Sequence, residues 1–239
     1  MRYNYKDKSI NVIGTKEHIQ SRINAYKKDK PKTVRWIENF DPNGIFYDVG
    51  SNIGGFSFLT KMIHSKMIVF SFEPNYLNYM VQVETIRNNE IKGLNPINMA
   101  LNDCDSYDFF YYESEKEGSK GNFGDLLERD LKESKWGNPF KKGVKFKLPI
   151  MGMSLDSFIQ RFKLPNPTYL KIDVDGNEGL VVDGMEETLK SKDLKEIMIE
   201  VDEMIKKNST IYTTIESHGF TETLDIYYGE GMRMKLYVR

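Results

Sequence analysis

Residues 45–58 read IFYDVGSNIGGFSF, and this stretch decides the fold of the chain. An apolar run ends at Asp48, a glycine-rich loop spans residues 50–55, and an apolar helical pattern follows. A second apolar run at 67–72 ends next to Glu73. A strand, a tight glycine loop and a helix, followed about 20 residues later by an acid, are typical of a doubly wound α/β sheet that binds a nucleoside. A glycine loop alone is weak evidence, and its conjunction with Asp48 and Glu73 predicts a cofactor site.

Two departures from the dinucleotide-binding pattern indicate which cofactor this is. The second glycine of G-x-G-x-x-G lets the backbone approach a pyrophosphate; Asn52 takes that place here, and its side chain would crowd a diphosphate. Asp48 puts a carboxylate where a cationic group is favoured over a phosphate. S-adenosylmethionine fits, because its sulfonium and ammonium groups are positive and it carries no phosphate. Glu73 is the natural acceptor for its ribose diol, and Pro74 is a favoured opening residue for the next helix.

The composition excludes several classes of protein. The 239 residues include 34 basic and 35 acidic side chains, intermixed, so a net charge of −1 provides no global field that would attract nucleic acid or an anionic membrane. Cys104 is the only cysteine, which leaves no intrachain disulfide and no cysteine-based zinc site. The first residues lack the apolar core of a secretory signal, and no apolar run approaches the ~20 residues of a membrane span. We therefore expect a soluble, cytoplasmic protein whose partner is a small-molecule or glycan acceptor.

The order of the patterns predicts one α/β domain with a helical cap. Residues 1–40 are expected to form the cap, with a helix over 15–29 and a solvated basic linker at 27–32. In residues 41–239, alternating apolar runs and helical patterns predict a Rossmann-like, mostly parallel sheet with helices on both faces and a C-terminal antiparallel hairpin. A charged segment at about 113–143 is expected to be an insertion, either a lid over the substrate or a loose surface excursion. Further expected elements are strands at 95–101, 107–112 and 144–151 and helices at 75–88, 178–189 and 205–218.

A second cluster of carboxylates follows a later buried strand. Asp173, Asp175 and Glu178 lie close together at the carboxyl end of the apolar run 169–173, the edge that lines the ligand crevice in an open α/β sheet. Crowded carboxylates raise one another's pKa, so one of the three would serve as a base near neutral pH, or the group would hold Mg²⁺ with water, although no metal site is predicted. In a purely structural interpretation, Glu178 favours a helix N-terminus and Asp175 forms a turn. The alternative bases are His18, His64 and His218.

Three motifs together resemble the FkbM-type family of S-adenosylmethionine-dependent methyltransferases. They are FYDVGSNIG at 46–54, FEP at 72–74 and LKIDVDGNE at 170–178. The resemblance implies a class I methyltransferase fold and, as acceptor, a hydroxyl of a sugar, a glycolipid or a similar polyhydroxylated metabolite. The chain departs from the family at Asp175, where the family usually has Glu. The side chain of Asp175 is one methylene shorter than that of Glu. The residues implied around the cofactor are Asp48, Gly50, Ser51, Asn52, Gly54, Glu73, Pro74, Ala100, Leu101 and Asn102.

Three hypotheses of function follow. The favoured one is an O-methyltransferase, in which an acceptor hydroxyl attacks the sulfonium methyl in line while Asp173, Asp175 or Glu178 orients or deprotonates it. Oxygen is favoured over nitrogen as the methylated atom, because the Asn/Asp-Pro-Pro-aromatic run of many nitrogen-methylating enzymes is absent at this strand end. The second hypothesis treats Asp173-Val174-Asp175 as the D-x-D of a metal-dependent nucleotide-sugar transferase. The third is a non-catalytic binding module on the same fold.

Overall fold

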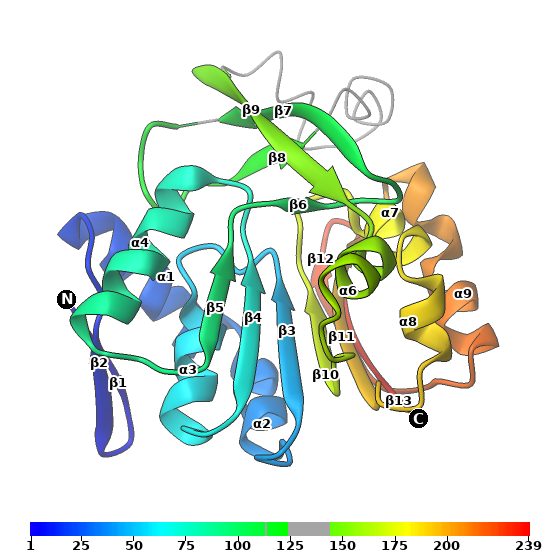
Figure 1. Cartoon of the computed structure of the whole chain (residues 1–239), viewed down its shortest axis with the longest axis horizontal. Helices are drawn as coiled ribbons and strands as arrows, with labels where there is room; N and C mark the ends of the chain where they lie inside the picture. Colours follow the sequence, from blue (N-terminus) through cyan, green and yellow to red (C-terminus); the bar gives the residue numbers. More distant parts are fainter. Residues whose placement is uncertain (113, 124–143) are drawn as a thin grey trace.

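A seven-stranded sheet forms the centre of the computed structural model (Figure 1), which describes residues 1–112, 114–123 and 144–239. Five neighbouring strands are parallel, and the last two strands of the chain form an antiparallel hairpin at one edge. The predicted sheet with its terminal hairpin is therefore confirmed. In spatial order the strands are β12 (Thr221–Gly229), β13 (Met232–Val238), β11 (Glu196–Asp202), β10 (Tyr169–Ile172), β3 (Ile45–Val49), β4 (Ile68–Phe72) and β5 (Leu94–Ile97).

The strand order reverses between β3 and β10, and this reversal locates the ligand crevice. β3 pairs in parallel with β4 on one side and with β10 on the other, and Val49 is in register with both Phe72 and Ile172. In open α/β sheets, ligands bind outside the carboxyl ends of the strands at such a switch point. The residues that follow the three strands at this edge are Gly50, Glu73 and Asp173.

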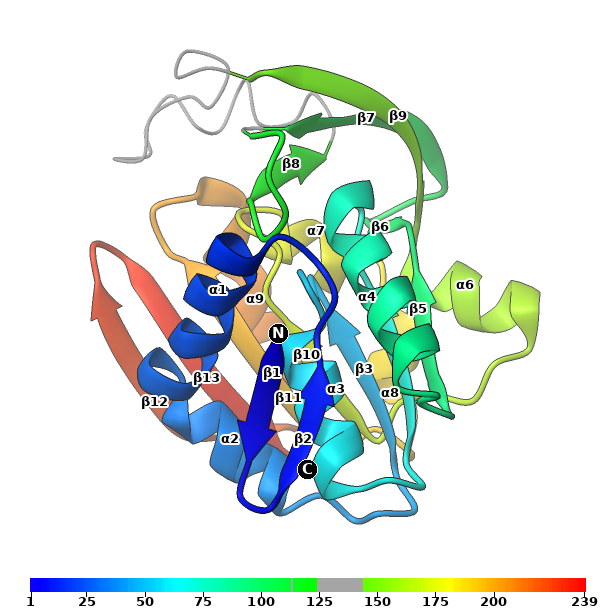
Figure 2. The same ribbon diagram turned by 90° about the vertical axis from the view of Figure 1, so that its left-hand side faces the viewer.

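Helices cover both faces of the sheet (Figure 2). Phe46 and Tyr47 are both fully buried and belong to the cores on opposite faces, which is why β3 reads as an unbroken apolar run. One face is covered by α1 (Lys16–Asp29), α2 (Pro31–Glu38), α3 (Gly55–Ile63) and α4 (Tyr76–Asn88). The other is covered by α6 (Leu155–Phe162), α7 (Glu178–Asp183), α8 (Glu186–Lys190), the 3₁₀ helix η1 (Lys206–Thr210) and α9 (Ile211–Ser217).

A smaller four-stranded sheet lies above the carboxyl ends of the main sheet (Figure 1). Its strands, in spatial order, are β6 (Ala100–Leu101), β9 (Phe146–Met153), β7 (Ser106–Tyr112) and β8 (Gly121–Phe123). The single strand predicted at 95–101 is wrong, because the chain leaves the main sheet after Ile97 and β6 pairs with β9 instead. Most of the insertion predicted at 113–143 lies outside the described residues, but 114–123 are described and include β8.

Other predicted elements are broken or joined differently. The helix predicted at 178–189 divides at Gly184, where a Cβ would lie 2.0 Å from the carbonyl oxygen of Asn102 and the two backbones therefore pack closely. The helix predicted at 205–218 begins with η1 before α9. The chain also starts with a hairpin that the sequence did not predict, and the helix predicted next is confirmed as α1. The two strands of this hairpin are β1 (Arg2–Tyr5) and β2 (Lys8–Asn11).

Candidate active site

The glycine loop between β3 and α3 forms one end of the site. Gly50 has a φ of 74°, and its N–H and that of Ser51 both donate to the carbonyl oxygen of Phe72 at 3.0 Å. A Cβ at Gly50 would lie 1.8 Å from the carbonyl oxygen of Asp173. Glycine is needed here for both reasons, because only a residue without a side chain tolerates this φ and this approach of the β10 backbone.

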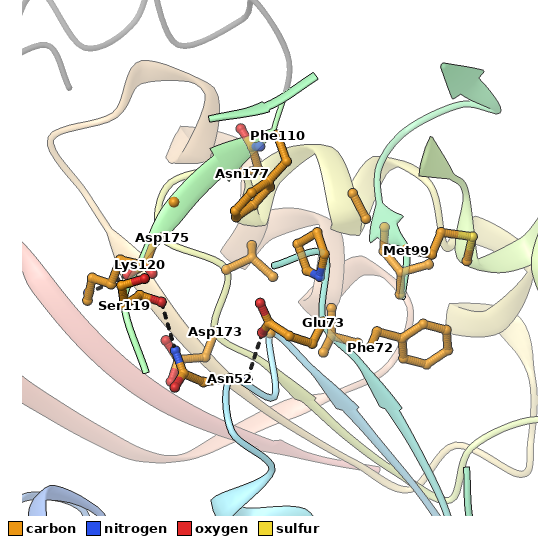
Figure 3. Close-up of a pocket in the computed structure, with 17 residues that line it drawn as sticks. Asn52, Phe72, Glu73, Met99, Phe110, Ser119, Lys120, Asp173, Asp175 and Asn177 are labelled. Carbon is orange, nitrogen blue, oxygen red and sulfur yellow. Dashed lines mark hydrogen bonds and ion pairs between the residues drawn. The ribbon is translucent and has the colours of Figure 1, made fainter. Parts of the chain in front are cut away.

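Glu73 at the end of β4 closes the loop from the other side (Figure 3). Its Oε2 accepts from the backbone N–H of Asn52 at 2.7 Å, and its Oε1 accepts from that of Asn75 at 2.9 Å. Burial raises the pKa of Glu73 to about 7, although the hydrogen bonds it accepts act in the opposite direction. Pro74 does not open α4 as predicted, because Asn75 is the N-cap and its side chain accepts from the backbone N–H of Leu77.

A cavity lies between the glycine loop, the carboxyl ends of β4 and β10, and the smaller sheet (Figure 3). Eight of the thirteen predicted site residues line it: Gly50, Asn52, Glu73, Pro74, Ala100, Leu101, Asp173 and Asp175. The other five predicted residues lie outside the lining: Asp48, Ser51, Gly54, Asn102 and Glu178. The remaining lining residues are Val49, Phe72, Met99, Phe110, Ser119, Lys120, Gly121, Val174 and Asn177.

Asp173 is the carboxylate that reaches the cavity from β10. Its Oδ2 lies 2.7 Å from the Nζ of Lys30 and 3.3 Å from the Nζ of Lys171. Burial by itself would raise the pKa of Asp173, but the two ammonium groups outweigh it and hold this pKa well below its usual range. Asp173 is therefore not the one of the three carboxyls whose pKa is raised toward neutral. Within the described part of the chain, Oδ1 has no hydrogen-bond partner.

Asp175 also lines the cavity and forms an ion pair with Lys120 (Figure 3). Its φ of 55° places it in the left-handed turn that the Asp-Gly sequence predicts. Lys120 belongs to the described part of the predicted insertion, so that segment contributes to the cavity wall. Asn78 fixes the segment, since its Oδ1 accepts from Gly118 and its Nδ2 donates to the carbonyl of Ser119.

The sequence matches the model of one protein family, the methyltransferase FkbM domain, over residues 48–222. This match covers most of the chain, including the loop, Glu73 and Asp173. The chain belongs to the FkbM methyltransferase family. Membership implies S-adenosylmethionine as the methyl donor.

Solved structures support the same fold for the FkbM domain. Methyltransferase FkbM from Methylobacillus flagellatus KT aligns with a TM-score of 0.56 and 13% identity over 91% of this chain and 52% of its own. A precorrin-6y C5,15-methyltransferase from Geobacter metallireducens GS-15 aligns with a TM-score of 0.51 and 9% identity over 95% of this chain and 94% of its own. The present chain thus spans about half the length of the first protein. No curated protein matches the sequence. At these identities the likeness concerns the fold alone, and the class I methyltransferase fold is confirmed.

Some lining residues of the FkbM cavity have the chemistry needed to hold S-adenosylmethionine. Glu73 offers carboxylate oxygens to a ribose diol, and Phe72, Met99 and Leu101 form an apolar wall suited to an adenine ring. Among the described lining residues, Lys120 carries the one ammonium group, and it forms an ion pair with Asp175. Asp173 is paired with Lys30 and Lys171 behind the lining, so the described lining offers no unpaired cation to a phosphate, in keeping with a ligand that carries none.

Four of the five predicted residues outside the lining stabilise the loops and strands that carry the lining residues. Asp48 is fully buried, its Oδ2 accepts from the Ser57 hydroxyl at 2.7 Å, and its Oδ1 lies 3.5 Å from the Nζ of Lys171. Ser51 accepts from the Gln82 amide, and Gly54 starts α3 with a φ of 83°. The N–H of Asn102 donates to the carbonyl of Met153 and so extends the pairing of β6 with β9 in the smaller sheet. Cofactor binding by these four residues stays a prediction.

Glu178 is the fifth predicted residue outside the lining, and its side chain holds the loop that follows β10. It is buried at the start of α7, where its Oε1 accepts from the N–H of Gly176 at 2.8 Å and its Oε2 accepts from the Asn208 amide at 2.9 Å. Burial raises the pKa of Glu178 to about 7. These contacts favour the structural interpretation of Glu178 over the catalytic one.

Glu178→Gln is expected to lower the free energy of unfolding by about 1–3 kcal/mol, because glutamine brings a second amide N–H₂ against the Asn208 amide and leaves a buried donor without an acceptor. Urea unfolding measures this loss, and calorimetry with S-adenosylhomocysteine is expected to give an affinity within about twofold of the unchanged protein. A large loss of affinity with intact stability would place Glu178 in the site after all.

The described residues offer few alternatives for other chemistry. Among them, no three His, Cys, Asp or Glu side chains are arranged to hold a metal ion. The ring nitrogens of His64 and His218 each lie 2.8 Å from a backbone carbonyl oxygen, and no histidine is among the described lining residues. In the same ranges, 1–112, 114–123 and 144–239, no helix has the length and apolar character needed to cross a membrane.

Sequence reasoning missed several residues of the FkbM site. The predicted solvated linker at 27–32 is wrong for Lys30, since this side chain is largely buried and forms ion pairs with Asp173 and Glu200. Lys171 is buried, within the motif whose carboxylates are the predicted catalytic groups. A lysine within an otherwise apolar strand was the available signal for Lys171, because a buried lysine needs a carboxylate partner. Ser119 and Lys120 carry no such signal.

Proposed function

We propose that the protein is an S-adenosylmethionine-dependent O-methyltransferase that acts on a hydroxyl of a sugar, a glycolipid or a similar polyhydroxylated metabolite. The observation that carries this proposal is the state of Asp173. Its carboxylate lines the cavity at the switch point, is held at Oδ2 by two lysines, and has Oδ1 without a partner among the described residues. An ionised, oriented acceptor of this kind suits a hydroxyl donor.

The lining residues divide into a cofactor side and an acceptor side. When bound, S-adenosylmethionine supplies an electrophilic methyl group. Glu73 would hold its ribose, and the backbone from Gly50 to Asn52 would follow its methionine part. Asp173 would accept a hydrogen bond from the acceptor hydroxyl and hold its oxygen in line with the methyl group, since positioning supplies much of the rate of such reactions.

The low pKa of Asp173 is compatible with this role. A hydroxyl becomes strongly acidic as its oxygen gains a methyl group, so the proton can pass to a weakly basic carboxylate late in the reaction. Asp173 therefore need not remove the proton before attack. The negative charge of Asp173 would also stabilise the positive charge that develops on the attacking oxygen.

The two other hypotheses gain no support from the site. Asp173 and Asp175 are paired with different lysines, Lys30 and Lys120, rather than presented jointly to a metal ion. A silent binding module would not need a cavity-lining carboxylate that two lysines hold in place. Both hypotheses remain outcomes of the experiment that follows.

The experiment combines binding with a survey of acceptors. Calorimetry is expected to show that S-adenosylhomocysteine binds, with or without EDTA, and that NADH and UDP-sugars do not. Tritiated S-adenosylmethionine is then incubated with sugars and glycolipids, and labelled methyl ethers are sought. Asp173→Asn is expected to bind S-adenosylhomocysteine and to transfer methyl groups about 100-fold more slowly, the cost of losing a charged hydrogen-bond partner. Absence of heat from S-adenosylhomocysteine would overturn the proposal; binding without transfer to any acceptor would favour the silent module.

A further inference from the structure

Lys30 is the one residue between α1 and α2, and its side chain reaches the catalytic edge of the sheet. It serves as the C-cap of α1 and the N-cap of α2, with φ −125° and ψ 51°. Its Nζ lies 2.7 Å from Oδ2 of Asp173 and 2.6 Å from Oε2 of Glu200. Lys30 thus bridges the carboxyl end of β10 and the neighbouring strand β11.

The position of Lys30 is fixed by the way α2 packs along β11. Pro31 opens the helix, where its fixed φ is already helical. Trp36 is buried, and its Nε1 donates to Oε2 of Glu196 at 2.6 Å. Glu196 is the first residue of β11, the strand that also contains Glu200. Two contacts with β11, at Glu196 and Glu200, therefore hold α2 and leave Lys30 little freedom to withdraw.

Several charged or titratable groups from four elements and three connecting segments surround Asp173. Lys171 on β10 is shared with Asp48 of β3, since its Nζ lies 3.5 Å from that carboxylate and 3.3 Å from Asp173. Glu200 of β11 adds a negative charge. Without Lys30, Asp173 and Glu200 would be neighbouring, largely buried carboxylates with only a shared lysine between them. The full set of groups facing Asp173 is Lys30, Lys171, Asp48, Glu200, Lys120, Asp175 and the hydroxyl of Tyr26 from α1.

We infer that Lys30 is a positioning residue for methyl transfer: its ion pair holds Oδ2 of Asp173 in place and so fixes a carboxylate that lines the cavity. The role assigned to Asp173 rests on the proposed function. The family match begins at residue 48, so Lys30 lies outside it. The N-terminal segment of this chain therefore contributes to the active site and does more than cover the sheet.

The first test observes the carboxyl group of Asp173 directly. The full chain is labelled with ¹³C at aspartate carboxyl carbons, and the Asp173 signal is assigned by its loss in Asp173→Asn. In the unchanged protein this signal is expected not to shift between about pH 5 and 8, because the group stays ionised. In Lys30→Met it is expected to titrate within that range, since two buried carboxylates that share one lysine cannot both stay ionised. An unchanged signal in Lys30→Met would overturn the inference.

Two further variants separate charge from packing. Lys30→Arg keeps the positive charge and is expected to leave the Asp173 signal without a titration. Lys32→Met removes an exposed lysine two residues away that forms no ion pair with any described residue, and is expected to match the unchanged protein. Adding Glu200→Gln to Lys30→Met removes the repelling charge and is expected to move the titration back toward lower pH. A purely structural role would give no such reversal, because a second substitution in the same contact would only disturb it further.

The second test uses methyl transfer to the acceptor found in the survey. In Lys30→Met, the rate of methyl transfer is expected to fall at least about tenfold as the pH decreases through the pKa of Asp173, which the substitution raises. The rate should recover at higher pH. The unchanged protein and Lys32→Met should show no such loss. A Lys30→Met rate that is low and independent of pH would also contradict the inference. The carboxyl titration needs neither cofactor nor acceptor, so it decides the inference even if the proposed function fails.

Discussion

Replacing Gly50 with alanine is expected to abolish cofactor binding and to lower the free energy of unfolding by about 2–5 kcal/mol. The added Cβ would lie 1.8 Å from the carbonyl oxygen of Asp173, a distance at which the loop and the end of β10 must separate. Separation would also break the two hydrogen bonds that hold Gly50 and Ser51 to the Phe72 carbonyl. The cavity would lose its wall on both sides at once.

Gly219→Ala is the matched control for this substitution. Gly219 has a φ of +85°, close to the +74° of Gly50, but a Cβ there would meet nothing within 4 Å. It should therefore cost only the backbone strain, about 1–2 kcal/mol, and leave affinity for S-adenosylhomocysteine unchanged. Urea unfolding and calorimetry on both variants measure the comparison. Equal losses at the two positions would show that the approach of β10 to the loop does not constrain the site.

The parts of the fold that the sequence predicts correctly are those with local causes. An apolar run before a glycine loop predicts β3 and α3, because one segment contains the strand, the turn and the start of the helix. The C-terminal hairpin is likewise predicted by two sheet-prone runs on either side of a glycine turn. In each case the residues that form the element also determine its neighbours.

The errors arise where a distant partner decides the outcome. The run 95–101 looks like one strand, but the choice of its last two residues to pair with β9 depends on a segment about 50 residues later. Lys30 looks like part of a solvated run, because basic residues surround it and its carboxylate partners lie 143 and 170 residues away. Periodicity contains no information about such contacts.

The sequence predicts where the site lies in the fold better than it predicts which side chains face the cavity. Asp48 and Glu178 belong to the correct motifs, yet neither is among the described lining residues of the cavity. Asp48 lies one residue before the end of β3 and is used by Ser57 and Lys171 behind the loop. Motif spacing identifies the strand end, but the pleat of the strand and the neighbouring side chains decide which carboxylate faces the ligand.

Glu73→Gln is expected to reduce affinity for S-adenosylhomocysteine by about 10–100-fold at a pH above 7, the effect of replacing a charged acceptor of ribose hydroxyls by a neutral one. Two backbone N–H groups, of Asn52 and Asn75, already donate to Glu73, so the carboxylate is fixed before any ligand arrives. Glutamine keeps the shape of the side chain but offers one acceptor oxygen where the carboxylate offers two.

The pKa of Glu73 adds a pH dependence with a defined sign. Because burial raises this pKa to about 7, part of the population is protonated in mild acid, and affinity should increase as the pH rises through that value. The free energy of unfolding should change in the opposite direction. The folded state binds the proton more tightly than the unfolded state, so stability falls as the pH rises from the ordinary glutamate range to about 7. Glu73→Gln should remove the pH dependence of affinity.

Glu178→Gln separates these two effects, because Glu178 is equally buried, its pKa is also raised to about 7, and it lies outside the cavity lining. It should reduce the dependence of stability on pH, measured by urea unfolding across that range, and leave the rise of affinity with pH intact. If both variants flatten the affinity profile, the titration acts through the fold as a whole. If only Glu73→Gln does so, the carboxylate at the end of β4 contacts the ligand, and the acid about 20 residues after the glycine loop has the role that its spacing predicts.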